Sequence, residues 1–260
     1  MKIVIIGTGN VATVLAKKLA VAGHTILQVY GRNGEAAMAL ANQVSAASCS
    51  SLAAITQDAE LYIAAVADGG LESIAANLRL HDQLLVHTAG AVSIEIFKGV
   101  SSAYGVFYPF QSIRKEIDPM PELPVMIDAS TAAAKELLLA TAKTISEKVS
   151  IADDAVRAKY HLCAVITNNF SNYLNTLAEA YCLKNGLHFS NLLPLFDESA
   201  RRLHHFSPRQ TQTGPAIRQD AATIRRHLDM LKADAALAGL YRVFSDEIAS
   251  HPWKILPQDS

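Results

Sequence analysis

The chain opens with a short apolar run that leads directly into a glycine-rich turn. Residues 2–6 are mostly β-branched, and Gly7-Thr8-Gly9-Asn10-Val11-Ala12 follows them at the head of a helix-like stretch. A strand, a Gly-x-Gly-x-x-Ala turn and a helix in this order are typical of the first unit of a Rossmann α/β domain. Gly7 permits the tight turn, Gly9 lets a ligand come close to the backbone, and Ala12 keeps the helix near the strand.

The same turn predicts what binds there. Backbone N–H groups at the start of the helix, at Asn10 and Val11, face an anion, and the helix dipole adds to the attraction. A pyrophosphate fits this arrangement, so we predict a dinucleotide site that includes Gly7, Thr8 and Gly9. The alternative is a fold that has kept the turn without the ligand.

The end of the second strand indicates which dinucleotide is bound. Residues 25–30 form that strand and lead into Gly31, Arg32 and Asn33. Enzymes that prefer NAD usually carry Asp or Glu at this strand end, and the nearest acid here, Glu35, lies beyond the turn. A guanidinium pairs bidentately with a 2′-phosphate, so Arg32 favours NADP, and Asn33 adds a neutral donor. The alternative is that Arg32 is a solvated turn residue.

Charge and cysteine content exclude several classes of protein. The 23 basic and 24 acidic residues give a net charge of −1, which argues against a nucleic-acid-binding protein. The three cysteines show no disulfide or metal-ligand spacing, so we expect a reduced, cytoplasmic protein without a metal site. We find no signal peptide and no apolar run long enough to cross a membrane.

Strand and helix patterns alternate through the first part of the chain. This alternation predicts a largely parallel, doubly wound sheet with helices on both faces. Further strands are expected at 45–48, 60–66, 83–87, 103–107, 124–127 and 149–152. Helices are expected at 34–44, 52–57, 71–78 and 131–148.

The pattern changes near residue 153, after which no convincing strand remains. We therefore predict a Rossmann NADP-binding domain at 1–153 and an all-helical substrate and dimerisation domain at 154–260. A cleft between two such domains is a common ligand site. The expected helices of the second domain cover 155–185, 189–203, 221–232 and 234–250, with a turn-rich segment at 207–215.

Two more turns should share the rim of the glycine turn, because ligands bind beyond the carboxyl ends of parallel strands. They supply Ala67, Asp68, Thr88 and Gly90 as further predicted cofactor-binding residues, and the Gly90 backbone is suited to the nicotinamide carboxamide. His87, at a strand end, is predicted to be a structural residue rather than a catalytic one.

These motifs resemble the Rossmann-like NADP oxidoreductase group that includes deazaflavin-dependent NADP reductases and pyrroline-5-carboxylate reductases. The closer similarity is to an uncharacterised bacterial branch with its own helical C-terminal domain, and it implies NADP binding and a homodimer formed through that domain. The matching segments are 7–12, 66–68, 87–90, 108–112, 160–169 and 213–220. Two residues depart from the branch: Tyr108 stands where it usually has His, and Gln219 where it tends to have Gly.

Candidate catalytic residues lie in the helical part. His161 and Asn168 are seven residues apart, which places them on one face of a regular helix. A polar stripe on an apolar helix is costly to bury unpaired, so it faces either a cofactor cleft or a helix–helix or dimer contact. We predict His161 as proton donor or substrate-orienting residue and Asn168 as a substrate hydrogen-bonding group.

The segment 213–220 supplies a second polar group. Arg218 is a candidate for holding a substrate carboxylate, with surface solvation as the alternative. Asp220 is expected to cap the helix that begins at Ala221, with holding Arg218 in place as the alternative. Taken together, the residues predict an NADP-dependent oxidoreductase that transfers a hydride to or from a small polar metabolite. The alternative is a non-catalytic NADP-binding sensor or interaction protein.

Overall fold

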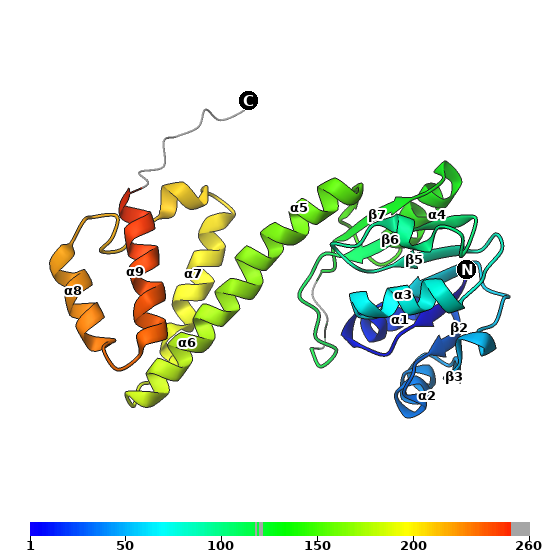
Figure 1. The fold of residues 1–260 in the computed structure, drawn as a ribbon, viewed down its shortest axis with the longest axis horizontal. Coiled ribbons are helices and arrows are strands. Elements are labelled where there is room, and N and C mark those ends of the chain that lie inside the picture. The colour runs from blue at the N-terminus through cyan, green and yellow to red at the C-terminus, as the bar shows by residue number, and fades with distance from the viewer. Residues whose placement is uncertain (118, 120–121, 251–260) are drawn as a thin grey trace. The chain divides into compact units, whose positions relative to one another are not determined.

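The computed structural model describes residues 1–117, 119 and 122–250. Contacts within the chain divide it into two compact units, Met1–Asn169 and a helical unit that starts at Phe170 (Figure 1). Each unit is described by itself below. Among the described residues, no helix has the length and apolar character required to cross a membrane.

The first unit is built on a single eight-stranded sheet in the part of the chain that the structure describes. The strand order is β3-β2-β1-β4-β5-β6-β7-β8, and all neighbours pair in parallel except β6 and β7, which are antiparallel. This confirms the predicted Rossmann class. The strands are β1 (Lys2–Ile6), β2 (Thr25–Tyr30), β3 (Ala47–Cys49), β4 (Leu61–Ala64), β5 (Leu84–His87), β6 (Ala103–Pro109), β7 (Val125–Ala129) and β8 (Val149–Ile151).

Helices cover both faces of this sheet. Alternate residues of β1 point to opposite sides, so Ile3 and Ile5 join one core and Val4 and Ile6 join the other. The first core is closed by helices α1 (Asn10–Val21), α2 (Gly34–Gln43) and α4 (Ala132–Lys143), and the second by α3 (Asp68–Asn77). Every residue of β4 and β5 is buried, as expected for central parallel strands.

Three local predictions differ from the structure. The helix expected at 52–57 is a single 3₁₀ turn at Leu52–Ala54, and α3 begins three residues earlier than expected, at Asp68. Helix α4 ends at Lys143 rather than near residue 148. Its last turn is closed by backbone bonds from Thr144 to Thr141 and from Ile145 to Ala142, and the chain then turns into β8.

Helix α5 (Asp154–Ala164) starts one residue after the predicted domain boundary at residue 153. It nevertheless belongs to the first unit, and its residues bond to other parts of that unit: Arg157 to the Val92 carbonyl, and His161 to Tyr108. A short π-helix, Val165–Phe170, follows it. A π-turn contains more residues than an α-turn, so the regular spacing from which we inferred a shared face for His161 and Asn168 does not hold across this segment.

The helical unit contains four long helices. They are α6 (Ser171–Lys184), α7 (Leu193–Leu203), α8 (Ala221–Met230) and α9 (Ala235–Ser250). Three of them match predicted helices, whereas the helix expected at 155–185 is interrupted by the π-helix, so only its last part, α6, lies in this unit. In this unit, the described residues form no strand. The turn-rich segment expected at 207–215 contains one 3₁₀ turn, Pro208–Thr211.

Candidate functional site

A pocket of about 600 Å³ opens where the strand order reverses, beyond the carboxyl ends of β1, β2 and β4. In open α/β sheets this is the position at which nucleotides bind. Its lining residues come from the three turns that follow these strands, from α3 and from the 3₁₀ turn at Leu52–Ala54. They are Gly7, Thr8, Gly9, Tyr30, Gly31, Arg32, Asn33, Leu52, Ala65, Val66, Ala67, Gly69, Gly70, Ser73 and Ile74.

The two glycines of the turn have different roles in this pocket. Gly7 has a φ of 130°, and a Cβ there would lie 2.2 Å from the Ala65 carbonyl oxygen, so the turn tolerates no side chain. A Cβ on Gly9 would meet no atom within 4 Å. The space beside Gly9 is therefore open at the N-terminus of α1, where an anion gains most from the helix dipole.

The end of β2 carries the predicted phosphate clamp. Arg32 is exposed and lines the pocket, and no other described residue accepts a hydrogen bond or forms an ion pair with it. Asn33 has a structural role, because its side-chain oxygen accepts a hydrogen bond from the Ala36 N–H and caps α2. The side-chain amide of Asn33 keeps its donors, whereas its oxygen is already in use.

The remaining predicted cofactor residues do not belong to the lining of this pocket. Asn10 and Val11 form the first turn of α1, and Asp68 begins α3. Thr88 and Gly90 follow β5, and Thr88 is buried. Of the rim residues predicted after β4 and β5, only Ala67 lines the pocket itself.

Gly90 lies instead beside a polar pair that the sequence did not bring together. The Tyr108 hydroxyl and Nδ1 of His161 are 3.0 Å apart, and the two rings are in edge-to-face contact. A Cβ on Gly90 would lie 2.5 Å from His161 Nδ1 and 2.9 Å from Tyr108 Cζ. Gly90 is therefore the residue that allows the loop after β5 to pack against the pair.

The surroundings of Tyr108 act on its acidity in opposite directions. Burial is the largest influence and raises the pKa of the Tyr108 hydroxyl above its usual value. The positive charge of Arg157 lowers that pKa, and the negative charge of Asp68 raises it. The tyrosine at position 108, where the branch usually has histidine, also carries a proton that it can give up.

His87 lies beneath the same loop and is fully buried. Its Nδ1 accepts a hydrogen bond from the Ala89 N–H, and its ring contacts Phe97 edge to face. Burial is the main cause, and together with the Arg157 charge it lowers the pKa of His87 to about 4. The ring is therefore neutral near pH 7, in agreement with a structural role.

The charge beneath the loop is the Arg157 guanidinium, which sequence reasoning missed. The side chain is fully buried, and Nη2 donates to the Val92 carbonyl and, at 2.7 Å, to Asp154 Oδ1. Its Nε and Nη1 have no partner among the described residues. In the sequence Arg157 is one of many charged residues on an amphipathic helix, and only the packing of α5 reveals its burial.

The other candidate catalytic residues lie outside this cluster. Asn168 is exposed on the π-helix. Arg218 is an exposed residue of the helical unit, and its charge lowers the pKa of the Asp220 carboxyl, on which a hydrogen bond from Thr223 has the largest such effect. Asp220 Oδ1 accepts from the Thr223 N–H at 3.0 Å, which confirms the predicted cap of α8.

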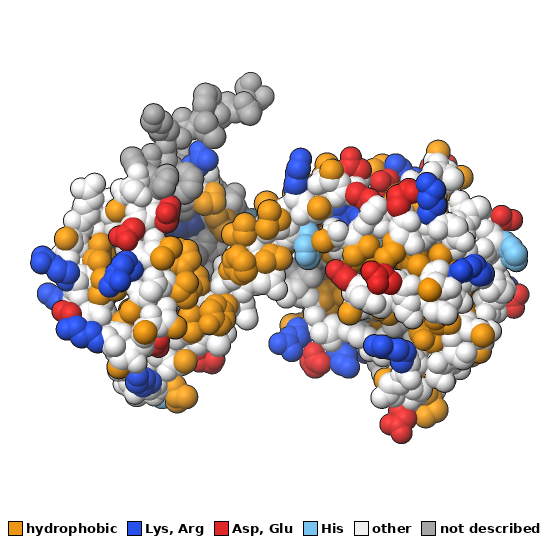
Figure 2. Space-filling view, viewed as in Figure 1, with side chains coloured by type: hydrophobic (Ala, Val, Ile, Leu, Met, Phe, Trp, Pro, Cys, Tyr) orange, Lys and Arg blue, Asp and Glu red, His pale blue; other side chains and the backbone are white. Residues whose placement is uncertain are grey.

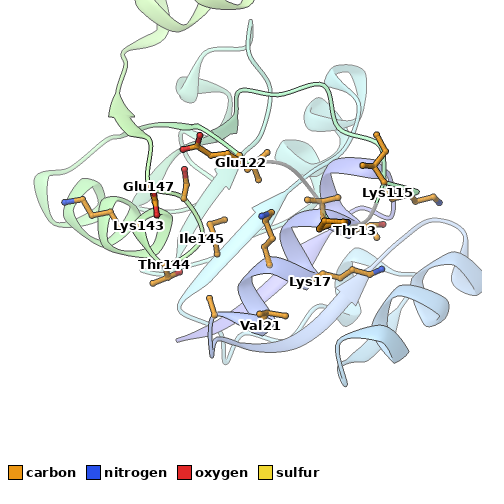
Figure 3. A pocket seen from close by; sticks show the side chains of 16 residues that line it. Thr13, Lys17, Val21, Lys115, Glu122, Lys143, Thr144, Ile145 and Glu147 are labelled. Carbon is orange, nitrogen blue, oxygen red and sulfur yellow. The ribbon is translucent and has the colours of Figure 1, made fainter. Parts of the chain in front are cut away.

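A larger hollow of about 1090 Å³ lies elsewhere on the sheet unit, along α1 and the end of α4 (Figure 3). Side chains of both charges line it, among them Lys17, Lys115, Lys143, Glu122 and Glu147. None of the predicted cofactor or catalytic residues belongs to its lining. Its size alone gives it no part in the chemistry predicted here.

Comparison with known proteins agrees with this geometry. Residues 2–90 match the family described as coenzyme F420-dependent NADP oxidoreductase, and residues 123–248 match a domain of unknown function, DUF2520. No curated protein matches the chain.

Solved structures extend the comparison to almost the whole chain. A candidate NADP oxidoreductase from Bacteroides fragilis is 40% identical with a TM-score of 0.90, over 96% of this chain and 98% of that one. A pyrroline-5-carboxylate reductase from Streptococcus pyogenes is 16% identical with a TM-score of 0.61, over 96% and 98% of the two chains.

A third structure is the reductive aminase from Aspergillus terreus in complex with NADPH and ethyl-5-oxohexanoate. It is 17% identical with a TM-score of 0.69, over 96% of this chain and 93% of that one. The last two similarities extend to the fold, whereas the Bacteroides fragilis protein also shares sequence along its whole length. The chain therefore belongs to the family of Rossmann-fold NADP oxidoreductases that join a coenzyme F420-dependent NADP oxidoreductase domain to a DUF2520 domain.

Proposed function

We propose that this protein is an NADP-dependent enzyme that transfers a hydride to or from a small polar metabolite. The observation that carries the proposal is the hydrogen-bonded Tyr108–His161 pair beside Gly90, in the unit that also holds the dinucleotide pocket. A cofactor pocket alone suits a sensor equally well. A proton-bearing pair next to the loop after β5 gives an oxidoreductase what a sensor does not need.

The choice of NADP over NAD rests on Arg32. A guanidinium without a partner at the end of β2 supports binding of a 2′-phosphate, and no carboxylate stands in its place to accept from a 2′-hydroxyl. Gly7, Thr8 and Gly9 would hold the pyrophosphate against the start of α1.

Replacing Arg32 tests this choice directly. We expect Arg32→Ala to weaken NADPH binding about 10- to 100-fold, as for the loss of a charge-assisted pair, and to leave NADH binding almost unchanged. Calorimetric titration with each coenzyme measures both values, and Arg226→Ala, at an exposed arginine on α8, is the control. Equal losses for the two coenzymes would remove Arg32 from the phosphate site.

A nicotinamide held in this site would supply the hydride, and the chain must then supply a proton. When a C=O or C=N carbon accepts the hydride, its oxygen or nitrogen takes a proton, and His161 is the donor that we propose. If the Tyr108 hydroxyl donates to Nδ1, the proton leaves from Nε2 while Nδ1 takes the proton of Tyr108. The substrate thus gains one proton, and the negative charge is left on the Tyr108 oxygen. A proton from solvent then restores the Tyr108 hydroxyl. In the oxidation direction the same steps occur in reverse order.

The substrate class follows from the polar groups that the chain offers. Arg218 is the candidate for a substrate carboxylate and Asn168 for a hydrogen bond to a polar substituent. Keto acids, cyclic imines and hydroxy acids combine a reducible or oxidisable centre with such groups. A screen of these compounds for NADPH oxidation, or for NADP reduction with hydroxy acids, tests the class.

His161→Ala separates the enzyme from the sensor. We expect kcat for a substrate found in the screen to fall about 10²- to 10⁴-fold, as for loss of a general acid, while the Kd for NADPH stays within about twofold. The exposed His204 provides a matched control, His204→Ala. Unchanged turnover would exclude His161 from the chemistry, and NADPH binding without turnover of any screened compound would favour the sensor.

We also propose that the helical unit pairs with a second copy of the chain. Among its described residues only Cys182, Ala216, Leu231 and Ser245 are buried, and α7 and α8 bury none of theirs. Large apolar side chains on α6, α7, α8 and α9 are exposed, and Figure 2 shows hydrophobic atoms gathered on this unit. An all-helical unit of this kind needs a partner surface of equal apolar character, which a second copy supplies.

The three cysteines, Cys49, Cys163 and Cys182, are free thiols. This supports a reducing compartment, and we propose that the protein acts in the cytoplasm. Recovery of the untagged protein with the cytoplasmic fraction of its own cells, and of its activity there, tests this assignment.

A further inference from the structure

The loop after β5, which contains Gly90 and packs against the Tyr108–His161 pair, is bonded to α5. The Arg157 guanidinium donates to the Val92 carbonyl, and Asp154 Oδ1 accepts from the Ile94 N–H at 3.3 Å. Arg157 and Asp154 also bond to each other at 2.7 Å. One ion pair on one turn of α5 therefore binds the loop at two positions, both of which follow Gly90 in the chain.

His161 stands on the same face of α5, one turn after Arg157, because residues four apart on a helix are neighbours. Helix α5 thus carries both the proposed proton donor, His161, and the ion pair that binds the loop containing Gly90. A shift of that loop by a few tenths of an ångström would change the fit of Gly90 on His161 and Tyr108, since a Cβ at Gly90 would already overlap both.

Burying a guanidinium in this place has a cost that its hydrogen bonds only partly offset. Arg157 is 0% exposed, whereas the side chain of its carboxylate partner Asp154 is 38% exposed. Two of the Arg157 nitrogens, Nε and Nη1, have no partner among the described residues. A neutral side chain of similar volume would fill this space without the free-energy cost of desolvating a charge. We therefore infer that the Arg157 charge has a role beyond packing.

We propose that Arg157 is a positioning residue of the reaction: it holds the Gly90 loop against the Tyr108–His161 pair and its buried charge stabilises the tyrosinate that forms when the pair gives up its proton. This inference rests on the proposed function. Arg157 itself touches neither substrate nor cofactor in this scheme, and it acts through Tyr108.

The charges around Tyr108 define the expected pH behaviour. Asp68 at the start of α3 is negative, Arg157 on α5 is positive and paired with Asp154, His161 on α5 is the hydrogen-bond partner, and buried His87 on β5 is neutral near pH 7. Of these, Arg157 is the one that favours the ionised hydroxyl. Its removal should therefore move the ionisation of Tyr108 to higher pH.

The first test needs no turnover. The protein is labelled with 3-fluorotyrosine, the Tyr108 signal is assigned with Tyr108→Phe, and its ionisation is followed by fluorine NMR. We expect Arg157→Gln to raise the midpoint by about one pH unit and Asp154→Asn to lower it, because the carboxylate that offsets the guanidinium is then neutral. Lys159→Gln, which removes an exposed charge from the same helix, should leave the midpoint almost unchanged.

The second test concerns the loop. Amide hydrogen exchange in the segment that contains Ile94 should be faster in Arg157→Gln and in Asp154→Asn than in the wild type or in Lys159→Gln. Arg157→Lys keeps the charge but loses the planar fork, so we expect it to loosen the loop while the Tyr108 midpoint stays near the wild-type value. Asp154→Asn and Arg157→Lys keep the test valid if Arg157→Gln does not fold.

Turnover then links these changes to the reaction. For Arg157→Gln we expect kcat for a substrate found in the screen to fall about tenfold or more, with the alkaline limb of the pH profile displaced upwards and KM for NADPH unchanged. A Tyr108 midpoint and an exchange rate that are both unchanged in folded Arg157 variants would overturn the inference, whatever the activity. Shifts in both with no turnover in any variant would instead refute the proposed function and leave the coupling of Arg157 to Tyr108 intact.

Discussion

At the scale of single residues, His87 shows how burial alone sets a protonation state. The ring is fully buried, and burial, aided by the Arg157 charge, lowers its pKa from 6.5 to about 4. In the unfolded chain the same ring takes up a proton below its ordinary value of 6.5. The folded state therefore binds fewer protons than the unfolded state between these two values.

Acidification should destabilise the protein through His87. Since the unfolded state binds the extra proton, the free energy of unfolding falls as the pH drops below 6.5, by about 2 kcal/mol at about pH 5, and the effect levels off near pH 4. Urea unfolding of wild type and His87→Gln at about pH 7 and about pH 5 measures it. The variant should lose most of the His87 share of this dependence, while His205→Gln, at an exposed site, should keep it. Identical pH slopes for His87→Gln and wild type would contradict the assignment.

More of the predicted cofactor residues than of the predicted catalytic residues lie together in the structure. Gly7, Gly9 and Arg32 line the pocket because a phosphate site is built from consecutive residues at two strand ends. Tyr108 and Arg157 were not predicted, since they are 49 positions apart and their significance arises from burial and from contact with one loop. A tyrosine in place of the branch's histidine was the one signal in the sequence.

At the scale of elements, the turn before α8 explains the second departure from the branch. Gln219 has a φ of 55°, in the left-handed region that glycine adopts without strain. Asp220, the next residue, caps α8, so the turn cannot relax without disturbing the helix start. The glycine usual in the branch fits this backbone, and glutamine adopts it at a cost.

Gln219→Gly should therefore stabilise the helical unit. Relief of the left-handed strain contributes about 1–2 kcal/mol and the greater freedom of glycine in the unfolded chain offsets up to about 1 kcal/mol, so we expect a net gain of roughly 1 kcal/mol. Thermal unfolding measures this as a higher Tm. Gln212→Gly, at a residue with a φ of −63°, is the matched control and should lower the Tm. A lower Tm for Gln219→Gly would show that the side chain makes up for the strain.

The helix that carries His161 also shows where a periodic pattern misleads. Residues 155–185 read as one helix, and the structure interrupts it with the π-helix Val165–Phe170. A π-helix of this length cannot be recognised from the residue types, because the amino acids within it are the same kinds that an α-helix contains. It nevertheless changes which later residues share a face with the earlier ones. The predicted partnership of His161 with Asn168 therefore remains a prediction, while that of His161 with Tyr108 is a contact.

At the scale of the whole molecule, the two units differ in how they bury apolar surface. The sheet unit has two cores, one on each face of the sheet. The described part of the helical unit buries four residues and exposes leucines, phenylalanines and other large apolar side chains along its helices. A hollow of about 440 Å³ lined by Leu183, Leu187 and Phe189 adds a concave apolar surface to this unit.

We expect the protein to sediment as a dimer at micromolar concentration, since the described part of the helical unit buries only four residues. Leu195→Glu, at a side chain 63% exposed on α7, should shift the equilibrium at least tenfold towards the monomer. Val21→Glu, at a side chain 90% exposed on α1 in the other unit, should leave it unchanged. A wild-type protein that sediments as a monomer at every concentration would contradict the proposed homodimer.

The sequence by itself determined the Rossmann class, the glycine turn, the helical second half and the cap at Asp220. These features depend on residues close in the chain, whose spacing fixes periodicity, turn geometry and local hydrogen bonds. The tertiary structure alone decided the burial of Arg157 and the pairing of Tyr108 with His161. It also decided which strand-end turns form one pocket, because charge, proton affinity and contact depend on neighbours that folding brings from distant positions.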